Sequence, residues 1–407
     1  MQTTLASFIK DRPEGAEAAA LLRACVHCGF CQATCPTYQL LGDELDSPRG
    51  RIHLIKQVLE GDIPTARTQL HLDRCLTCRA CETACPSGVQ YGRLLEIGRQ
   101  VVIERQPRPW AQRVLRRVLA AWLTGPLFAP SVAVGRVLRP LLPRALAVSL
   151  PPRVAAGAVP NTGQHIRTVL LLGGCVQPAL APRITAATVR VLHALNIRTV
   201  TPPQAGCCGA IHQHLDAPAA AQADARRNID AWWPHVQAGI EAIIVNTSGC
   251  GTQLRDYGLL LRDDPVYAVR AARVSALVRD LSELVAPQVA VLRERVPGLA
   301  GQRVACHSPC SLQHAQRLGG VVEQLLTGLG VVLVPVAEPA LCCGAAGTYH
   351  LLQPALSQSL RERKLAALTQ GQPQRIVSAN LGCLLQLAPD APVPIGHWIE
   401  LVDQHLS

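Results

Sequence analysis

The sequence Cys25-Val-His-Cys28-Gly-Phe-Cys31-Gln-Ala-Thr-Cys35-Pro36 returns further along the chain as Cys75-Leu-Thr-Cys78-Arg-Ala-Cys81-Glu-Thr-Ala-Cys85-Pro86. In each copy, three cysteines are separated by two residues and a fourth precedes proline, which is the spacing of bacterial proteins with two [4Fe-4S] clusters. In that pattern the fourth cysteine of each motif ligates the other cluster. We therefore expect one cluster on Cys25, Cys28, Cys31 and Cys85, and the other on Cys35, Cys75, Cys78 and Cys81.

The alternative interpretation of these motifs is a pair of four-cysteine zinc sites, because C-x-x-C pairs also bind zinc. Zinc sites usually present two pairs of cysteines, whereas each motif here has three cysteines in series and a fourth before proline. The spacing therefore favours iron–sulfur clusters over zinc.

A helix is predicted between the two motifs. Ser47 is a suitable N-cap and Pro48 a suitable first-turn residue, and the helix should run to Gly61. A long helix at this place indicates the helical form of the ferredoxin domain, which we assign to residues 1–100.

The cysteines outside the two motifs are far away in the sequence. Eight of the 17 cysteines lie between Cys25 and Cys85, and the other nine lie between Cys175 and Cys383. We interpret residues 101–165, which fall in the gap, as a helical, proline-rich connector.

The connector contains an apolar stretch that a membrane could accommodate. Residues 118–135 carry no charge, but Gly125 and Pro126 divide them into two helices too short to cross a bilayer. Trp110 and Arg113 are typical of a helix that lies on a membrane surface. The alternative is a helix docked on another subunit.

The N-terminal sequence, the net charge and the aromatic content limit the possible compartment and partners of the protein. No apolar signal segment is visible at the N-terminus, so the cysteines are expected to stay reduced in the cytoplasm, where metal ligation is their usual role. The net charge of +11 suits an acidic partner, an anionic membrane or nucleic acid, although an Arg-rich codon bias explains it as well. Few Phe and Tyr residues are available to stack on bases, so we expect no nucleic-acid partner.

Residues 166–300 and 301–407 repeat one pattern of strands and helices. In each half a strand, a helix and a second strand lead to Cys-Cys-Gly, and a longer helical region then leads to a β-branched run that ends in a lone cysteine. The pieces are Thr168–Leu172, Ile184–Leu195, Arg198–Thr201 and Ala242–Cys250 in the first half, and Arg303–Cys306, Leu312–Leu329, Val331–Pro335 and Arg375–Cys383 in the second. Short apolar strands that alternate with helices predict a parallel sheet in each half.

Ligands of parallel sheets collect at the carboxyl ends of the strands. Every cysteine of the two halves is expected to follow a strand, so three strand ends in each half should bring thiols to one edge. The candidate ligands of a further iron–sulfur cluster or zinc are Cys175, Cys207, Cys208, Cys250, Cys310, Cys342, Cys343 and Cys383. Nearby histidines, His307 and His314 above all, are further candidates as ligands or proton donors. The alternative is that these thiols are unmetallated and simply pack in the interior.

With these motifs in place, the chain resembles a family. The two repeats resemble the Cys-Cys-Gly domains of the heterodisulfide reductase B subunit and of the iron–sulfur subunits of glycolate oxidase and anaerobic glycerol-3-phosphate dehydrogenase. The resemblance is greatest to the glycolate oxidase iron–sulfur subunits. It rests on Arg23-Ala-Cys-Val-His-Cys-Gly-Phe-Cys31, Thr37-Tyr-Gln-Leu-Leu-Gly-Asp-Glu44, Ser47-Pro-Arg-Gly-Arg51, Asn228-Ile-Asp-Ala-Trp-Trp233, Leu312-Gln-His-Ala-Gln316 and His397-Trp-Ile-Glu-Leu-Val402.

The resemblance implies an electron-transfer subunit of a glycolate, or related 2-hydroxy-acid, dehydrogenase. A flavoprotein partner with FAD would oxidise glycolate to glyoxylate, and this chain would pass the electrons toward a membrane quinone. The chain would then be a cytoplasmic protein bound peripherally to the inner face of the membrane. The alternatives are a catalytic subunit that reduces a disulfide or a quinone, and the iron–sulfur subunit of a D-lactate or glycerol-3-phosphate dehydrogenase. No G-x-G-x-x-G follows a predicted strand, so the flavin should be on the partner.

The repeats depart from the disulfide-reducing relatives at one position. In those relatives each repeat ends in C-x-x-C, whereas here Gln253 follows Cys250 and Gln386 follows Cys383 at the second cysteine position. Each repeat therefore keeps four cysteines, with Cys306 left over. The unusual fused clusters of the disulfide-reducing enzymes are not expected.

Overall fold

The computed structural model describes residues 1–141, 150–152, 154–161 and 165–406. Two compact units are formed, the first by Met1–Leu115 with Ala340–Glu362 and the second by Arg116–Pro339 with Arg363–Ser407. The predicted connector and the last predicted domain include residues 142–149, 153, 162–164 and 407, which lie outside the described residues. The domain boundaries drawn from the sequence stay predictions.

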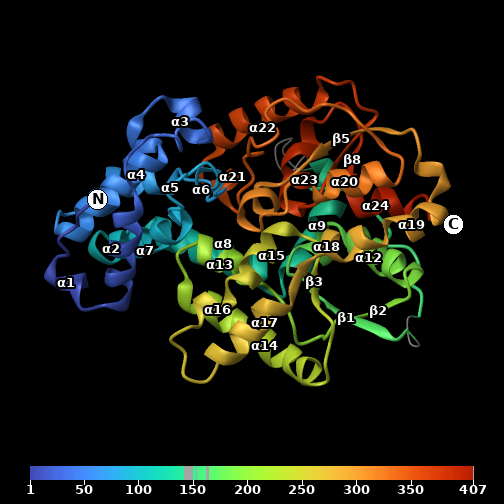
Figure 1. The fold of residues 1–407 in the computed structure, drawn as a ribbon, viewed down its shortest axis with the longest axis horizontal. Helices are drawn as coiled ribbons and strands as arrows, with labels where there is room; N and C mark the ends of the chain where they lie inside the picture. The colour runs from blue at the N-terminus through green and yellow to red at the C-terminus, as the bar shows by residue number, and fades with distance from the viewer. Residues whose placement is uncertain (142–149, 153, 162–164, 407) are drawn as a thin grey trace. The chain divides into compact units, whose positions relative to one another are not determined.

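The first unit is built of helices around the two cysteine motifs. Leu22 of α2, Ile55 of α4 and Leu94 of α7 are fully buried in its core, and Figure 1 shows these three helices close to one another. The helices are α1 Ser7–Lys10, α2 Pro13–Ala24, α3 Pro36–Leu41, α4 Pro48–Glu60, α5 Ala66–Asp73, α6 Ala80–Thr83, α7 Tyr91–Arg105, α21 Tyr349–Leu352 and the first part of α22 Pro354–Thr369, with a 3-10 turn at Glu44–Asp46.

The helix predicted between the motifs is confirmed as α4. Ser47 is its N-cap and accepts a hydrogen bond from the Gly50 N–H at 3.0 Å, Pro48 is its first residue, and Gly61 follows its last turn with φ 121°. These signals act within one helical turn, so they could be identified without the tertiary structure.

The second unit contains two parallel four-stranded sheets, one for each repeat (Figure 1). Their strand orders, β2-β1-β3-β4 and β6-β5-β7-β8, correspond position by position. The strands are β1 Arg167–Leu171, β2 Ile197–Val200, β3 Ile243–Val245, β4 Val278–Asp280, β5 Arg303–His307, β6 Val332–Leu333, β7 Arg375–Ser378 and β8 Ile395–His397. The predicted fold class, a helical ferredoxin domain followed by two parallel-sheet repeats, is confirmed.

Helices cover these sheets and complete the cores. Trp232 of α14 and Trp398 of α24 are fully buried among the apolar side chains of the strands. The helices are α9 Phe128–Val137, α11 Gln177–Leu180, α12 Pro182–Ala194, α13 Ala210–His214, α14 Pro218–Gln237, α15 Ser248–Arg255, α16 Tyr257–Leu260, α17 Ala268–Leu277, α18 Leu281–Val285, α19 Val289–Arg295, α20 Val321–Gly328, α23 Leu381–Leu387 and α24 Trp398–Asp403.

Each sheet has one strand more than the sequence analysis identified. The additional strands, β4 and β8, have three residues each and pair in parallel with β3 and β7. Neither has an apolar run, because Arg279 and Gly396 stand at their middle positions. Strands this short depend on sheet pairing rather than on their own side chains.

The helix predicted over Leu312–Leu329 is not continuous. A short π-helix at Ser311–Ala315 is followed by a break, and α20 begins only at Val321. Arg317 and Gly320 have positive φ values of 58° and 84° in the break. Left-handed residues end a helix, so the apolar periodicity alone was misleading here.

The expectation that every cysteine of the repeats follows a strand is wrong for Cys306. It lies inside β5 and is buried in the apolar core. Burial, together with the neighbouring carboxylate of Glu323, raises its pKa well above the usual value.

The predicted apolar stretch of the connector forms two helices, α8 Trp110–Thr124 and α9. Among the described residues, no single helix is long and apolar enough to cross a membrane. Only α8 and α9 taken together meet that length and composition, and they are bent by 87° at their junction.

Candidate iron–sulfur site

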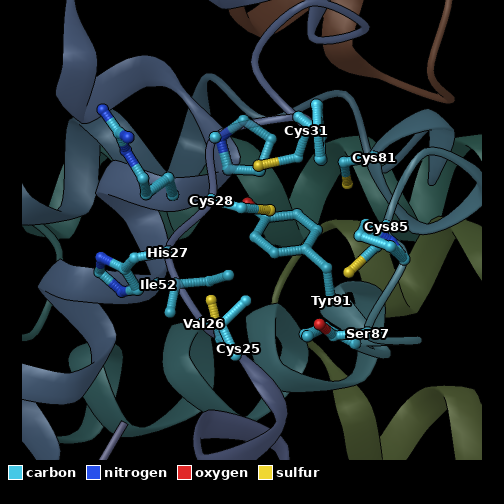
Figure 2. A pocket seen from close by; sticks show the side chains of 16 residues that line it. Cys25, Val26, His27, Cys28, Cys31, Ile52, Cys81, Cys85, Ser87 and Tyr91 are labelled. Atoms are coloured by element: carbon cyan, nitrogen blue, oxygen red, sulfur yellow. The ribbon is translucent and has the colours of Figure 1, made fainter.

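Five cysteines of the first unit face one pocket. Figure 2 shows Cys25, Cys28, Cys31, Cys81 and Cys85 with their sulfur atoms directed into it, around the ring of Tyr91. Four of them form the first predicted ligand set, and they come from both motifs.

A second pocket holds the other predicted set. Cys35, Cys75, Cys78 and Cys81 line it, again from both motifs. Cys81, Pro48 and Tyr91 line both pockets, so the two pockets adjoin.

The loops that carry these cysteines have the same backbone geometry. His27 and Gly29 in the first motif and Thr77 and Arg79 in the second have φ values of 56°, 85°, 52° and 58°. They stand at equivalent positions, two and four residues after the first cysteine of each motif. Left-handed residues in alternation turn successive cysteines toward one centre, and such strain in non-glycine residues is concentrated at functional sites.

The chemistry of these sites fits a metal cluster. Burial and the neighbouring Cys25 raise the pKa of Cys31 to about 11, and burial and Cys78 raise the pKa of Cys81 well above its usual value. Thiolates crowded together out of water are costly without a positive charge among them. Iron supplies that charge, and thiolate sulfur is its ligand in [4Fe-4S] clusters. The residues therefore fit the group that the spacing predicts.

The first repeat brings its four candidate cysteines together in the second unit. Cys175 follows β1, Cys207 and Cys208 follow β2, and Cys250 lies in α15 just after β3. Thiol hydrogen bonds join Cys175 to Cys207, Cys207 to Cys208, and Cys208 to Cys250. All four are free thiols, so they form a soft donor set of the size that iron or zinc takes.

The electrostatics of this set centre on Cys207. Hydrogen bonds from the thiols of Cys175 and Cys208 lower the pKa of Cys207, and His212 acts in the same direction. Nδ1 of His212 lies 2.6 Å from Asp224 Oδ2, and its Nε2 lies 3.4 Å from the Thr124 hydroxyl. His212 is therefore oriented by a carboxylate beside the cysteines, a common arrangement around metal sites.

The cysteines of the second repeat are divided between the two units. Cys342 and Cys343 lie buried in the first unit, where the Gly344 N–H donates to Cys342 Sγ at 3.5 Å. Cys310 and Cys383 lie in the second unit, where Asn380 Nδ2 is 3.3 Å from Cys383 Sγ.

Two of the candidate histidines differ in their surroundings. His307 is 2% exposed, and neither of its ring nitrogens has a hydrogen-bond partner among the described residues. Burial, with Lys364 nearby, holds its pKa well below the usual value. A neutral imidazole is the form that binds metals, so His307 stays a candidate ligand. His314 lies instead on the π-helix Ser311–Ala315, outside the strand that carries His307.

Several residues around the second pocket were missed by the sequence analysis. Arg51, Asp46 and His71 are almost fully buried, and Tyr91 lies against Cys75. The available signal was the motif Ser47-Pro-Arg-Gly-Arg51, whose last arginine falls on the inner face of α4.

Comparisons with known proteins agree with this description. The family model of a 4Fe-4S dicluster domain matches residues 21–89, and that of a cysteine-rich domain matches residues 169–255 and 304–388. The resemblance stated from the sequence is thus supported for both parts of the chain.

Individual relatives match between about half and the whole of the chain. The glycolate oxidase iron-sulfur subunit of Escherichia coli (strain K12) is 49% identical over 408 aligned residues, which cover 100% of both proteins. The probable glycolate oxidase iron-sulfur subunit of Bacillus subtilis (strain 168) is 32% identical over 89% of this chain and 87% of its own length. Lactate utilization protein A of Exiguobacterium is 24% identical over 58% of this chain and 97% of its own. The spacing of the cysteines, their convergence and the matches to the two glycolate oxidase subunits show that this chain belongs to the family of glycolate oxidase iron–sulfur subunits.

Proposed function

We propose that this chain is the electron-transfer subunit of a multisubunit glycolate dehydrogenase. In the proposed complex a flavoprotein with FAD oxidises glycolate to glyoxylate, and this chain carries the electrons onward to a membrane quinone. The observation that carries the proposal is the pair of adjoining cysteine pockets, because neighbouring clusters allow short electron steps.

The stoichiometry of the reaction suits two clusters. Glycolate loses two electrons and two protons when it becomes glyoxylate, and a quinone takes up two of each when it becomes a quinol. A [4Fe-4S] cluster, when bound, exchanges single electrons, so it links a two-electron donor to a two-electron acceptor one electron at a time. In this chain Cys25, Cys28, Cys31 and Cys85 would hold one cluster, and Cys35, Cys75, Cys78 and Cys81 the other.

We propose in addition that the first repeat binds a further cluster or zinc through Cys175, Cys207, Cys208 and Cys250. The hydrogen-bonded thiols and the oriented His212 support this. For the second repeat, the set Cys310, Cys342, Cys343 and Cys383 stays a prediction from sequence.

The relay role predicts the outcome of leaving this chain out of the complex. Glycolate-driven reduction of an artificial dye by the flavoprotein should continue without it, whereas reduction of a soluble quinone analogue should fall to the background of the flavoprotein alone. Both rates are measured anaerobically with purified subunits. Equal quinone reduction with and without this chain would contradict the relay role.

The same assay separates the second candidate substrate, lactate. The similarity to lactate utilization protein A favours testing D-lactate beside glycolate. Quinone reduction driven by D-lactate but not by glycolate would assign the complex to lactate, with the relay unchanged.

We also propose that α8 holds this chain on the membrane surface. Trp110, Val114, Val118 and Trp122 recur every four residues on α8 and are all exposed, with Trp110 73% and Val118 60% exposed. Exposed arginines flank this stripe. An apolar stripe beside cationic side chains is the composition of helices that bind anionic lipid surfaces.

The double variant Trp110→Ser/Val118→Ser is expected to weaken binding to vesicles of phosphatidylethanolamine and phosphatidylglycerol by about tenfold or more. Fully burying one such side chain contributes about 1.5–3 kcal/mol, and about 1.4 kcal/mol is a factor of ten. Vesicle co-sedimentation measures the change. The matched control is Ile63→Ser/Val269→Ser, which removes equally exposed apolar side chains elsewhere. If Trp110→Ser/Val118→Ser does not weaken binding, or weakens it no more than the control does, the proposed membrane role of α8 is wrong.

A further inference from the structure

The motif Ser47-Pro-Arg-Gly-Arg51 has a geometry that aims one side chain at the second cysteine pocket. Ser47 caps α4, and Gly50 lies so close to the preceding turn that a Cβ there would be 2.0 Å from the carbonyl oxygen of Glu44. The first turn of α4 is therefore pressed against residues 44–46. This close packing turns Arg51 inward, where it is 1% exposed.

The guanidinium of Arg51 is held on two sides. Its Nε donates to the carbonyl oxygen of His71 at 2.7 Å, and its Nη2 donates to Thr37 Oγ1 at 3.1 Å and Asp46 Oδ1 at 3.3 Å. The remaining nitrogen, Nη1, lies 3.9 Å from Cys35 Sγ. Because its Nε and Nη2 are both hydrogen-bonded, the planar guanidinium group cannot rotate. Its Nη1 is therefore held facing the sulfur of Cys35.

Arg51 is the donor that Cys35 can use when it is a thiolate. Thr37 Oγ1 also lies 3.3 Å from Cys35 Sγ, but its single proton is donated to the carbonyl oxygen of Asp46 at 2.9 Å. On the other side of the pocket, Tyr91 donates its hydroxyl to Cys75 Sγ at 3.6 Å. Both sulfurs belong to the second predicted ligand set.

The charged side chains in contact with Asp46 beside this pocket leave a positive sum, of which Arg51 is the buried member. Asp46 is fully buried and contacts two guanidinium groups, that of the buried Arg51 at 3.3 Å and that of the partly exposed Arg74 at 2.8 Å. One carboxylate against two guanidinium groups leaves one positive charge. In an interior of low dielectric that charge acts strongly on neighbouring sulfurs.

Among the described residues that line the first pocket there is no buried guanidinium. In the described part of the chain, the sulfurs of Cys25, Cys28 and Cys85 receive no side-chain hydrogen bond. The guanidinium that lines this pocket, that of Arg49, is 34% exposed and paired with Glu44 at 2.8 Å, so its charge is neutralised and screened by water.

We propose that Arg51, with Tyr91, raises the reduction potential of the cluster on Cys35, Cys75, Cys78 and Cys81 above that of the other cluster. Reduction adds one negative charge, which a buried cation and hydrogen-bond donors to sulfur stabilise. With both clusters bound, one electron would pass downhill from the site held by Cys25, Cys28, Cys31 and Cys85 to the site beside Arg51. The first site would lose one electron and the second would gain one, with no change of bond or proton. This inference rests on the proposed two-cluster function and sets the order of the two sites within it.

The test is a redox titration of the purified, cluster-loaded protein followed by EPR. Arg51→Met should lower the reduced-to-oxidised ratio of one cluster at least tenfold at a fixed ambient potential, which for one electron corresponds to about 59 mV. The other cluster should not move. Arg51→Lys keeps the charge without the fork and should shift the same cluster less. Arg51→Met leaves Asp46 with Arg74 at 2.8 Å and His71 at 3.1 Å, so this carboxylate stays paired.

Two further variants complete the test. Tyr91→Phe removes only a hydroxyl and should shift the same cluster in the same direction by less, which keeps the proposal testable if Arg51→Met does not hold its cluster. Arg93→Met is the matched control, because Arg93 is paired with Glu17 at 2.9 Å and bonds to no sulfur among the described residues. Cys28→Ser, which alters the EPR signal of the cluster in the first pocket, identifies which signal is which.

The outcomes separate this inference from the function on which it rests. Purified protein without iron would overturn the proposed function itself. The inference alone would be overturned if the protein holds both clusters but Arg51→Met and Tyr91→Phe change neither reduction potential or change both equally. It would also be overturned if these variants change the potential of the cluster identified by Cys28→Ser.

Discussion

Replacing Cys85 by alanine is expected to remove one cluster and about four of the eight iron atoms that two [4Fe-4S] clusters contribute. The cluster lost should be the one held by Cys25, Cys28 and Cys31, although Cys85 lies in the other motif. Alanine is chosen because a serine oxygen could still ligate iron. Iron analysis and EPR under anaerobic conditions measure the loss.

Double variants distinguish interleaved from local ligation. Cys28→Ala/Cys85→Ala should lose no more iron than either single variant, because both residues hold the same cluster. Cys78→Ala/Cys85→Ala should lose the iron of both clusters. If each motif held its own cluster, Cys78 and Cys85 would share one, and the two double variants would exchange their results.

Replacing Asp46 by alanine is expected to cost about 3–5 kcal/mol of stability in the first unit, the range for breaking a buried ion pair from one side. Asp46 is fully buried, and its removal leaves Arg51 and Arg74 without their shared carboxylate. Native-state hydrogen exchange of amides in α4 and α5, on the cluster-loaded protein, measures the free energy of opening.

The matched control for Asp46 is Glu17→Ala. Glu17 is paired with Arg93 at 2.9 Å, but both side chains are partly exposed, so water can solvate the charge left behind and the expected cost is smaller than for Asp46. The double variant Asp46→Ala/Arg51→Met should be less destabilised than the sum of its parts, because the unpaired cation is gone. Equal effects of Asp46→Ala and Glu17→Ala would show that the buried charge network is not important for stability.

The start of α4 could be predicted from the sequence, whereas the conformation of the cysteine loops could not. The caps of α4 could be identified because they act within one turn, whereas the left-handed conformation of Thr77 and Arg79 could not. Nothing in those two side chains favours positive φ, and the conformation results from the path that the cysteines must take. The strands β4 and β8 were missed for the same reason, since their neighbours in the sheet determine them.

The sequence by itself determined the family, the two cysteine motifs and the duplicated pattern of strands and helices. These depend on spacing and on periodicity, which are local properties of the chain. Only the tertiary structure placed Arg51 beside Cys35 and Tyr91 beside Cys75, each across a long separation in sequence. A hydrogen bond to a sulfur depends on where folded helices bring a side chain, so the difference between the two cluster sites could be inferred only from the folded chain.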